Sequence, residues 1–146
     1  MPLRGVPDVI SPELLYALAK MGHGDQLVIA DGNFPSDSVA SQCVIQQPVR
    51  INGTTAEILK AILMLFPLDQ YSQEKVQVMD RVHSDKERNL YVPAYCALAE
   101  AAALTDEALT YVERFAFYEK AKSAFVVVQT NDRALYANCI ITKGVL

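Results

Sequence analysis

The 146-residue sequence contains no tryptophan, two histidines and only three cysteines. Cys43, Cys96 and Cys139 lie far apart and form no Cys-x-x-Cys pair, so a disulfide framework and a zinc site are both excluded. This cysteine usage suits a reducing, cytoplasmic compartment. No apolar run approaches the roughly 18 residues of a membrane span. The N-terminal MPLRGVPDV also lacks the apolar core of a signal peptide.

A cluster of positive charge is also missing. The net charge is −4, the isoelectric point is near 5.1, and the lysines and arginines are scattered along the chain. Nucleic acids and anionic membranes are therefore not expected partners, because both require a basic face. Apolar residues make up 51% of the sequence, which is enough for a packed core. The length favours one domain over residues 1–146.

The sequence carries none of the common cofactor or nucleophile motifs. It has no G-x-G-x-x-G, no P-loop, no H-E-x-x-H and no G-x-S-x-G. Each of these patterns places a phosphate, a metal ion or a nucleophile at a defined backbone geometry. We therefore expect a protein that works without a cofactor, a metal ion or a covalent intermediate.

Helical and strand-like patterns alternate along the chain. Helices are expected from Ser11-Pro12-Glu13 to Gly22 and over residues 56–66, 93–104 and 115–123. The short apolar run QLVIA at 26–30 and the fully apolar run at 124–128 predict buried strands. Residues 76–82 alternate like a half-buried strand, and 136–142 predicts another strand. Residues 43–51 are a weak strand candidate. The alternation predicts an α/β fold: a single three-layer domain with a mainly parallel sheet.

The stretch MGHGDQLVIAD places His23 between two glycines and brackets an apolar strand with Asp25 and Asp31. An imidazole can both give and take a proton near neutral pH, so His23 is a candidate acid and base. The alternative is a solvent-facing ring in a turn. Asp31 closes the strand, where it could bind hydroxyl groups or form an Asx turn. Asp25 is interpreted as a turn residue and His83 as solvated surface.

Two later segments combine polar groups with aromatic ones. In RFAFYEK, Arg114 could bind sugar oxygens beside an aromatic wall, or it could pair with a nearby carboxylate over core aromatics. In YANCIIT, Tyr136 and Asn138 are two residues apart, so a strand would point both side chains to one side. Buried polar side chains need partners, which a ligand or an internal network could supply. Together these groups suit hydrogen bonding to a polyol and proton transfer.

Four ordered motifs resemble the RbsD/FucU family over essentially the whole chain. They are SPELLYALAKMGHGD, SDKER, RFAFYEKAKSAF, and LYAN close to the final KGVL. The arginine-aromatic run favours the fucose branch of the family. Ala137 stands where that branch usually has glycine, and Tyr-Ala-Asn also occurs in the ribose branch. The resemblance implies an RbsD-like fold and homo-oligomers, often ring-shaped decamers, with sites at subunit interfaces.

The resemblance also implies roles for particular residues. The acid/base histidine of the family corresponds to His23, and its sugar-binding aspartate and arginine correspond to Asp31 and Arg114. Its Tyr-x-Asn pair corresponds to Tyr136 and Asn138. Two further catalytic positions of the fucose branch correspond to Asp69 and Tyr118. In the expected reaction His23 handles one proton, and either Tyr136 or Tyr118 handles the other.

The activity implied by the fucose branch is L-fucose mutarotation, the interconversion of the α and β anomers by acid/base ring opening and reclosure. It requires no cofactor. Two alternatives stay open. A D-ribose pyranase shares the ring-opening step, and a non-catalytic monosaccharide-binding module would use the same polar groups only to hold a sugar. A weaker third interpretation treats the polar cluster as structural in an assembly protein.

Overall fold

A computed structural model describes residues 2–146. The helices are α1 (Pro12–Lys20), α2 (Ser36–Ala40), α3 (Thr55–Leu63), α4 (His83–Glu87), α5 (Pro93–Ala101) and α6 (Arg114–Lys122), with a 3₁₀ turn η1 (Asp106–Ala108). The strands are β1 (Gln26–Ala30), β2 (Val49–Arg50), β3 (Val76–Met79), β4 (Thr110–Val112), β5 (Val126–Gln129) and β6 (Cys139–Thr142). Helices and strands alternate over most of the chain, as the sequence predicts.

The six strands form one sheet in the order β2-β5-β1-β6-β3-β4. The pairs β2/β5, β1/β5 and β3/β4 are parallel. Strand β6 enters between β1 and β3 and runs antiparallel to both. The expectation of a mainly parallel sheet is confirmed, with an antiparallel strand in the middle that sequence patterns did not indicate.

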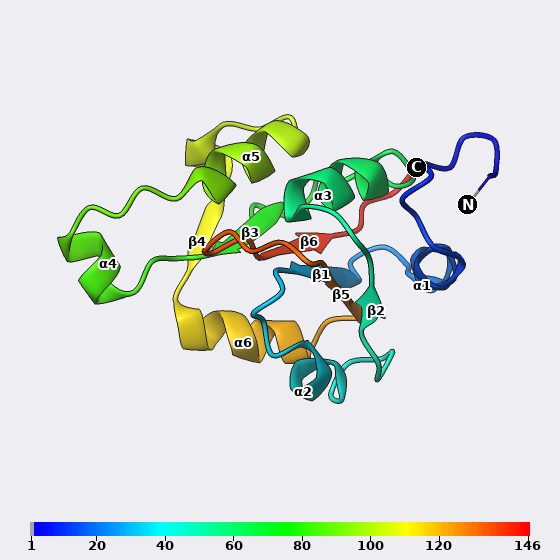
Figure 1. The fold of residues 1–146 in the computed structure, drawn as a ribbon. Coiled ribbons are helices and arrows are strands. Elements are labelled where there is room, and N and C mark those ends of the chain that lie inside the picture. The colour runs from blue at the N-terminus through cyan, green and yellow to red at the C-terminus, as the bar shows by residue number, and fades with distance from the viewer. Residues whose placement is uncertain (1) are drawn as a thin grey trace.

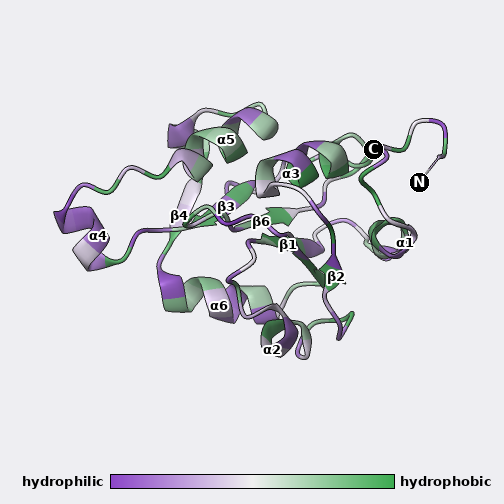
Figure 2. Ribbon diagram, viewed as in Figure 1, coloured by the Kyte–Doolittle hydropathy of each residue, from purple (hydrophilic) through white to green (hydrophobic). Residues whose placement is uncertain are grey.

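Helices cover both faces of the sheet, so the three-layer arrangement is also confirmed (Figure 1). Alternate residues of β1 face opposite layers. Leu27 and Ile29 belong to the core beneath α3 and α5, whereas Val28 packs with Phe117 of α6 on the other face. The strands are accordingly the most hydrophobic part of the ribbon (Figure 2). Burial of this apolar surface is the main force that holds the layers together.

The helix ends follow from local side-chain chemistry. The Ser11 hydroxyl accepts a hydrogen bond from the Leu14 amide at the start of α1. Helix α3 begins with a complete capping box, in which Thr54 and Glu57 each accept a hydrogen bond from the other's amide. Helix α3 ends at Leu63, three residues before the end that Pro67 predicts. These caps satisfy backbone amides in the first turn and so fix where α1 and α3 begin.

Some sequence expectations were wrong. Strand β3 ends at Met79, and its four residues are all buried instead of alternating, because helices pack on both faces of the sheet. The last strand begins at Cys139, so Tyr136 and Asn138 precede it. Only Val49–Arg50 of the weak candidate at 43–51 is a strand. The short elements α2, α4 and β4 were not predicted, because a few residues carry too little periodicity.

Residues 81–92 form an extended arm around α4, which we call the α4 arm. It projects from the end of the sheet at the left of Figure 1 and is largely hydrophilic in Figure 2. No residue of α4 itself is buried. The arm is therefore held by a small number of specific contacts instead of by core packing.

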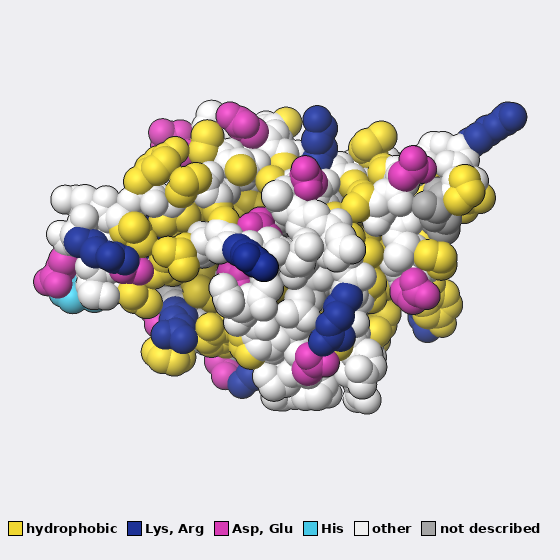
Figure 3. Space-filling view, viewed as in Figure 1, with side chains coloured by type: hydrophobic (Ala, Val, Ile, Leu, Met, Phe, Trp, Pro, Cys, Tyr) yellow, Lys and Arg dark blue, Asp and Glu magenta, His cyan; other side chains and the backbone are white. Residues whose placement is uncertain are grey.

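Charged side chains of both signs are interspersed on the face shown in Figure 3. That view shows no large basic field. Within residues 2–146, no helix has the length and apolar character needed to cross a membrane.

Candidate functional site

A cavity of about 290 Å³ opens where β1 and β3 end and where the chain is about to enter β6. Its lining mixes polar and aromatic side chains: Asp31, Asn33, Phe34, Met79, Val82, Asp85, Arg114, Tyr118, Leu135, Tyr136 and Asn138. Loops after the carboxyl ends of strands are the usual ligand sites of open α/β sheets. The volume lies at the lower limit for ligand pockets, so it suits a small molecule.

Asp31 and Asn138 form a reciprocal pair at the base of this cavity. The Asp31 amide donates to Asn138 Oδ1 (2.8 Å), and Asn138 Nδ2 donates to Asp31 Oδ2 (3.1 Å). Both residues are at most 5% exposed. Burial raises the pKa of Asp31, and hydrogen bonds from Asn33 and Asn138 oppose that rise. Each carboxylate oxygen accepts one of these bonds and keeps a lone pair for a ligand hydroxyl.

Asp31 forms the expected Asx turn and also lines the cavity. The Asn33 amide donates to Asp31 Oδ1 (2.9 Å), so the Asx turn is real. The same carboxylate still lines the cavity. The turn fixes the orientation of the side chain and does not remove it from the site.

Arg114 and Tyr118 reach the cavity from the first two turns of α6. Arg114 Nε donates to the Tyr118 hydroxyl (3.4 Å), and its guanidinium lies 5.5 Å from the ring centre of Phe115 and 5.7 Å from that of Tyr118. The Phe34 ring packs 5.5 Å from Tyr118. The Arg114 guanidinium and the rings of Phe34 and Tyr118 therefore form one wall of the cavity. A guanidinium has five N–H donors, and the bond to Tyr118 engages one of them.

Tyr136 reaches the cavity through a turn and not through a strand. Its φ is +59°, and its carbonyl accepts a hydrogen bond from the Asn138 amide (2.9 Å). Tyr136 and Asn138 do share one side, as expected, but strand alternation is not the cause, because both residues precede β6. Both side chains line the cavity because Tyr136 adopts a left-handed backbone conformation, which turns the chain just before β6.

His23 lies elsewhere, in the loop that leads into β1. The loop needs Gly24, whose φ is +86°, and the Gly22 amide donates to Asp25 Oδ2 (2.7 Å). The interpretation of Asp25 as a turn residue is confirmed. The loop leaves the His23 side chain 45% exposed.

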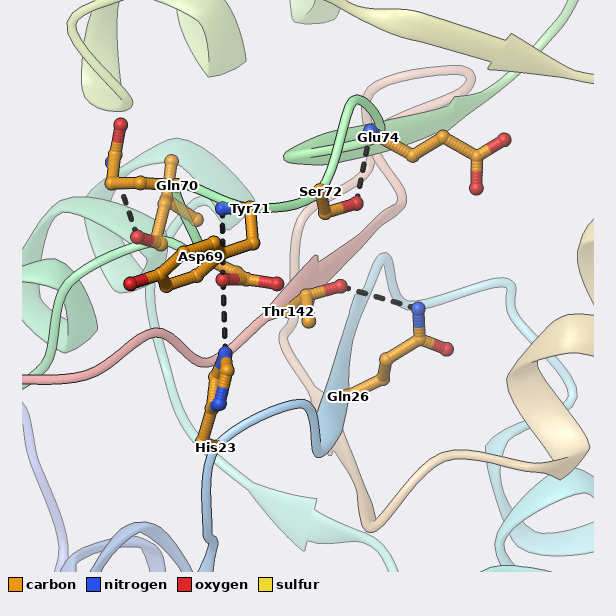
Figure 4. A network of polar contacts seen from close by, with 9 residues as sticks. His23, Gln26, Asp69, Gln70, Tyr71, Ser72, Glu74 and Thr142 are labelled. Carbon is orange, nitrogen blue, oxygen red and sulfur yellow. Dashed lines mark hydrogen bonds and ion pairs between the residues drawn. The ribbon is translucent and has the colours of Figure 1, made fainter.

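Asp69 holds the exposed imidazole. Its Oδ1 lies 3.0 Å from His23 Nε2 and also accepts a hydrogen bond from the Tyr71 amide (3.1 Å), as Figure 4 shows. The bond to His23 is the main reason that the pKa of Asp69 is lowered. The Tyr71 ring lies 5.8 Å from the imidazole. His23, Asp69 and Tyr71 form what we call the imidazole cluster.

The imidazole cluster and the cavity lie beyond opposite ends of β1. His23 precedes this strand and Asp31 follows it. Five strand residues at roughly 3.3 Å each separate the two ends by roughly 17 Å. Neither His23 nor Asp69 lines the cavity. One chain therefore brings together five of the seven expected site residues and keeps the other two apart.

The second histidine is not part of either group. The His83 side chain is 86% exposed and pairs with Glu87 (3.0 Å) on α4, as expected of solvated surface. Among residues 2–146, no three His, Cys, Asp or Glu side chains are arranged to hold a metal ion.

Sequence reasoning missed Asp85, a cavity residue on the α4 arm. It lies in the motif SDKER, which carried part of the family resemblance, but five mostly charged residues are typical of a solvated face. Phe34, Met79 and Leu135 also line the cavity, and nothing in their local pattern separated them from core or surface residues.

The sequence and the fold both match known proteins. A family model described as the RbsD / FucU transport protein family matches residues 4–146. The chain belongs to this family. It is 52% identical to a fucose mutarotase of Danio rerio over 147 residues, covering 99% of this chain and 94% of that protein.

Two solved structures extend the comparison. FucU from Bifidobacterium longum is 43% identical, with a TM-score of 0.86 over 98% of this chain and 99% of the other. The fucose mutarotase of Streptococcus pneumoniae, solved in complex with L-fucose, is 37% identical, with a TM-score of 0.78 over 99% of both chains.

Proposed function

We propose that this protein is an L-fucose mutarotase, which interconverts the α and β anomers of the free sugar. One observation carries the proposal: a small cavity in which a buried Asp31–Asn138 pair faces the Arg114 guanidinium. Acceptors and donors at fixed positions suit the hydroxyl groups of one monosaccharide. Relatives that share about half of this sequence are named fucose mutarotases.

The reaction requires only proton transfers. A base removes the proton of the anomeric hydroxyl, the bond between the anomeric carbon and the ring oxygen breaks, and an acid protonates the ring oxygen. The open-chain aldehyde turns its other face, and the same steps run in reverse. Nothing is oxidised or reduced, and a well-placed acid or base accelerates such a step by about 10²- to 10⁴-fold.

The cavity supplies binding groups for this reaction. Asp31 accepts from sugar hydroxyls, and Arg114 and Asn138 donate to sugar oxygens. Phe34 and the Tyr118 ring offer an apolar surface for the C5 methyl group of a 6-deoxy sugar. Tyr118 and Tyr136 place two hydroxyl groups beside the bound sugar.

His23 handles one of the two protons, and Asp69 orients its ring through the 3.0 Å contact. The hydroxyl group of Tyr118 or Tyr136 handles the other proton. Because the imidazole cluster and the cavity of one chain are separated, the imidazole must come from a second copy. We therefore infer a homo-oligomer whose sites form between subunits, with the ring-shaped decamer of the family resemblance as its expected size. The three free cysteines, Cys43, Cys96 and Cys139, support a cytoplasmic location.

Two-dimensional exchange NMR with the purified protein tests the activity and its rivals. With L-fucose, the account expects cross-peaks between the α and β anomers far above the spontaneous rate, without added metal or cofactor. Cross-peaks only between pyranose and furanose forms of D-ribose would favour a pyranase. Calorimetric binding of L-fucose without faster exchange would favour a binding module.

A further inference from the structure

The hydroxyl group of Tyr136 has two partners on the α4 arm. It donates to Asp85 Oδ2 (2.6 Å) and accepts from the Val82 amide (3.1 Å). A phenol has one hydrogen and two lone pairs, so one lone pair remains. Tyr136 can therefore accept a hydrogen bond from a ligand in the cavity, but its own proton is engaged.

Asp85 is itself held in place. Arg88 donates to Asp85 Oδ1 from Nε (3.0 Å) and Nη2 (2.8 Å), and the Asp85 side chain is 16% exposed. The hydrogen bond from Tyr136, followed by the one from Arg88, lowers the pKa of Asp85. The carboxylate is therefore charged at neutral pH and acts as a strong acceptor for the Tyr136 proton.

The backbone of Tyr136 also needs support. A bulky residue with φ near +59° is strained, and such a conformation persists only when its surroundings hold it. The turn continues through the bond from the Asn138 amide to the Tyr136 carbonyl, and Asn138 in turn binds Asp31. A chain of hydrogen bonds therefore runs from Asp85 through Tyr136 and Asn138 to Asp31.

Tyr118 differs from Tyr136 in the state of its hydroxyl proton. Its oxygen accepts the bond from Arg114 Nε (3.4 Å), and no residue within 2–146 accepts its hydrogen. Both hydroxyl groups line the same cavity. Only the Tyr118 hydroxyl is free to donate a proton to a bound molecule.

We propose that Asp85 is a positioning residue that acts through Tyr136: it holds the Tyr136 hydroxyl as an acceptor for a sugar hydroxyl and leaves Tyr118 as the proton-donating tyrosine. This inference rests on the proposed sugar site and adds the α4 arm to it. Tyr136 then contributes to binding, and Tyr118 contributes to the proton transfer that partners His23.

A double-mutant cycle tests the coupling. Asp85→Asn in the wild-type background should raise KM for L-fucose about tenfold, the effect of one lost hydrogen bond, with little change in kcat. In a Tyr136→Phe background the same change should have no further effect on KM. Equal effects in both backgrounds would overturn the proposal. Asp37→Asn is the matched control, because Asp37 also pairs with an arginine, Arg50, but lies outside the cavity.

A second contrast separates the two tyrosines. Tyr118→Phe should lower kcat at least tenfold, because a proton donor is lost. Tyr136→Phe should act mainly on KM. The reverse pattern, with kcat lost in Tyr136→Phe and retained in Tyr118→Phe, would contradict the assignment.

A spectroscopic measurement tests the contact independently of activity. The seven tyrosines can be labelled with ¹³C at Cζ, and Tyr136 is assigned by the signal missing from Tyr136→Phe. Burial and the bond to Asp85 raise the pKa of Tyr136, so Asp85→Asn should lower this one pKa and leave the other signals in place. An unchanged Tyr136 titration would overturn the contact. If the wild type exchanges no L-fucose, the proposed function fails. The titration then still decides whether Asp85 holds the Tyr136 hydroxyl group.

Discussion

The two ends of β1 are built in different ways. At the carboxyl end, Asp31 and Asn138 are at most 5% exposed and bond to each other in both directions. At the amino end, the side chain of His23 is 45% exposed, and Asp69 holds it through one 3.0 Å contact. Binding groups are thus preorganised inside one chain, whereas the group that would move protons stands at a surface.

The difference has a simple physical basis. Sugar hydroxyls are recognised by fixed donors and acceptors, which a buried network holds in place without reorganisation. In the proposed function His23 enters the cavity of a neighbouring subunit, so its side chain has to project from its own chain. The loop around Gly24 places the imidazole at the surface, and the contact with Asp69 orients the ring.

The largest expected effect comes from removing the imidazole. His23→Ala should slow anomer exchange about 10²- to 10⁴-fold, because the proton-transfer group is lost while the cavity is intact. Exchange NMR measures the rate, and calorimetry should show that L-fucose still binds. His83→Ala is the matched control, because that ring is 86% exposed and belongs neither to the cavity lining nor to the imidazole cluster. Normal exchange in His23→Ala would contradict the assignment.

A substitution in the cavity should weaken L-fucose binding, whereas His23→Ala should leave binding intact. Asp31→Ala should weaken L-fucose binding roughly 10- to 100-fold, because a buried hydrogen-bond acceptor is lost. It should also lower the free energy of unfolding by about 1–3 kcal/mol, since Asn138 Nδ2 loses its partner. Calorimetry and denaturant unfolding measure the two effects. Unaltered affinity would remove Asp31 from the site.

The smallest expected effect concerns acid stability at the imidazole cluster. The pKa of Asp69 is lower in the folded protein, mainly through its bond to His23. Its stabilising contribution is therefore present above the unfolded aspartate pKa of about 4 and is lost as pH falls through the folded value. Asp69→Asn should be less stable than the wild type at pH 7, and the difference should shrink toward pH 3. Thermal unfolding midpoints across that range provide the measurement, and a constant difference would contradict it.

Sequence patterns predicted the layers well because apolar periodicity reports burial directly. The buried strand at 26–30 was predicted at its structural bounds, and the capped helix after Thr54 was predicted within one residue at its start and three residues too long at its end. The antiparallel position of β6 was not predictable in this way, since its pairing depends on strands far away in the sequence. Local signals cannot specify such partners.

The candidate site was predicted less completely, and for a related reason. Asp31 and the Tyr-Ala-Asn segment stood out as polar interruptions of apolar strands. Their meeting depends on the positive φ of Tyr136, which no residue pattern indicated. Asp85 was hidden in a charged run. The separation of His23 from the cavity emerges only when both ends of β1 are seen together.

Mixing two inactive variants tests the sharing of sites between subunits most directly. His23→Ala and Asp31→Ala proteins are each expected to exchange L-fucose slowly, and they are unfolded together, refolded and assayed by exchange NMR. If each site takes its imidazole from one subunit and its cavity from another, random assembly restores about a quarter of the wild-type activity. If the mixture is no more active than its two components, the site does not combine groups from two copies and the account is wrong.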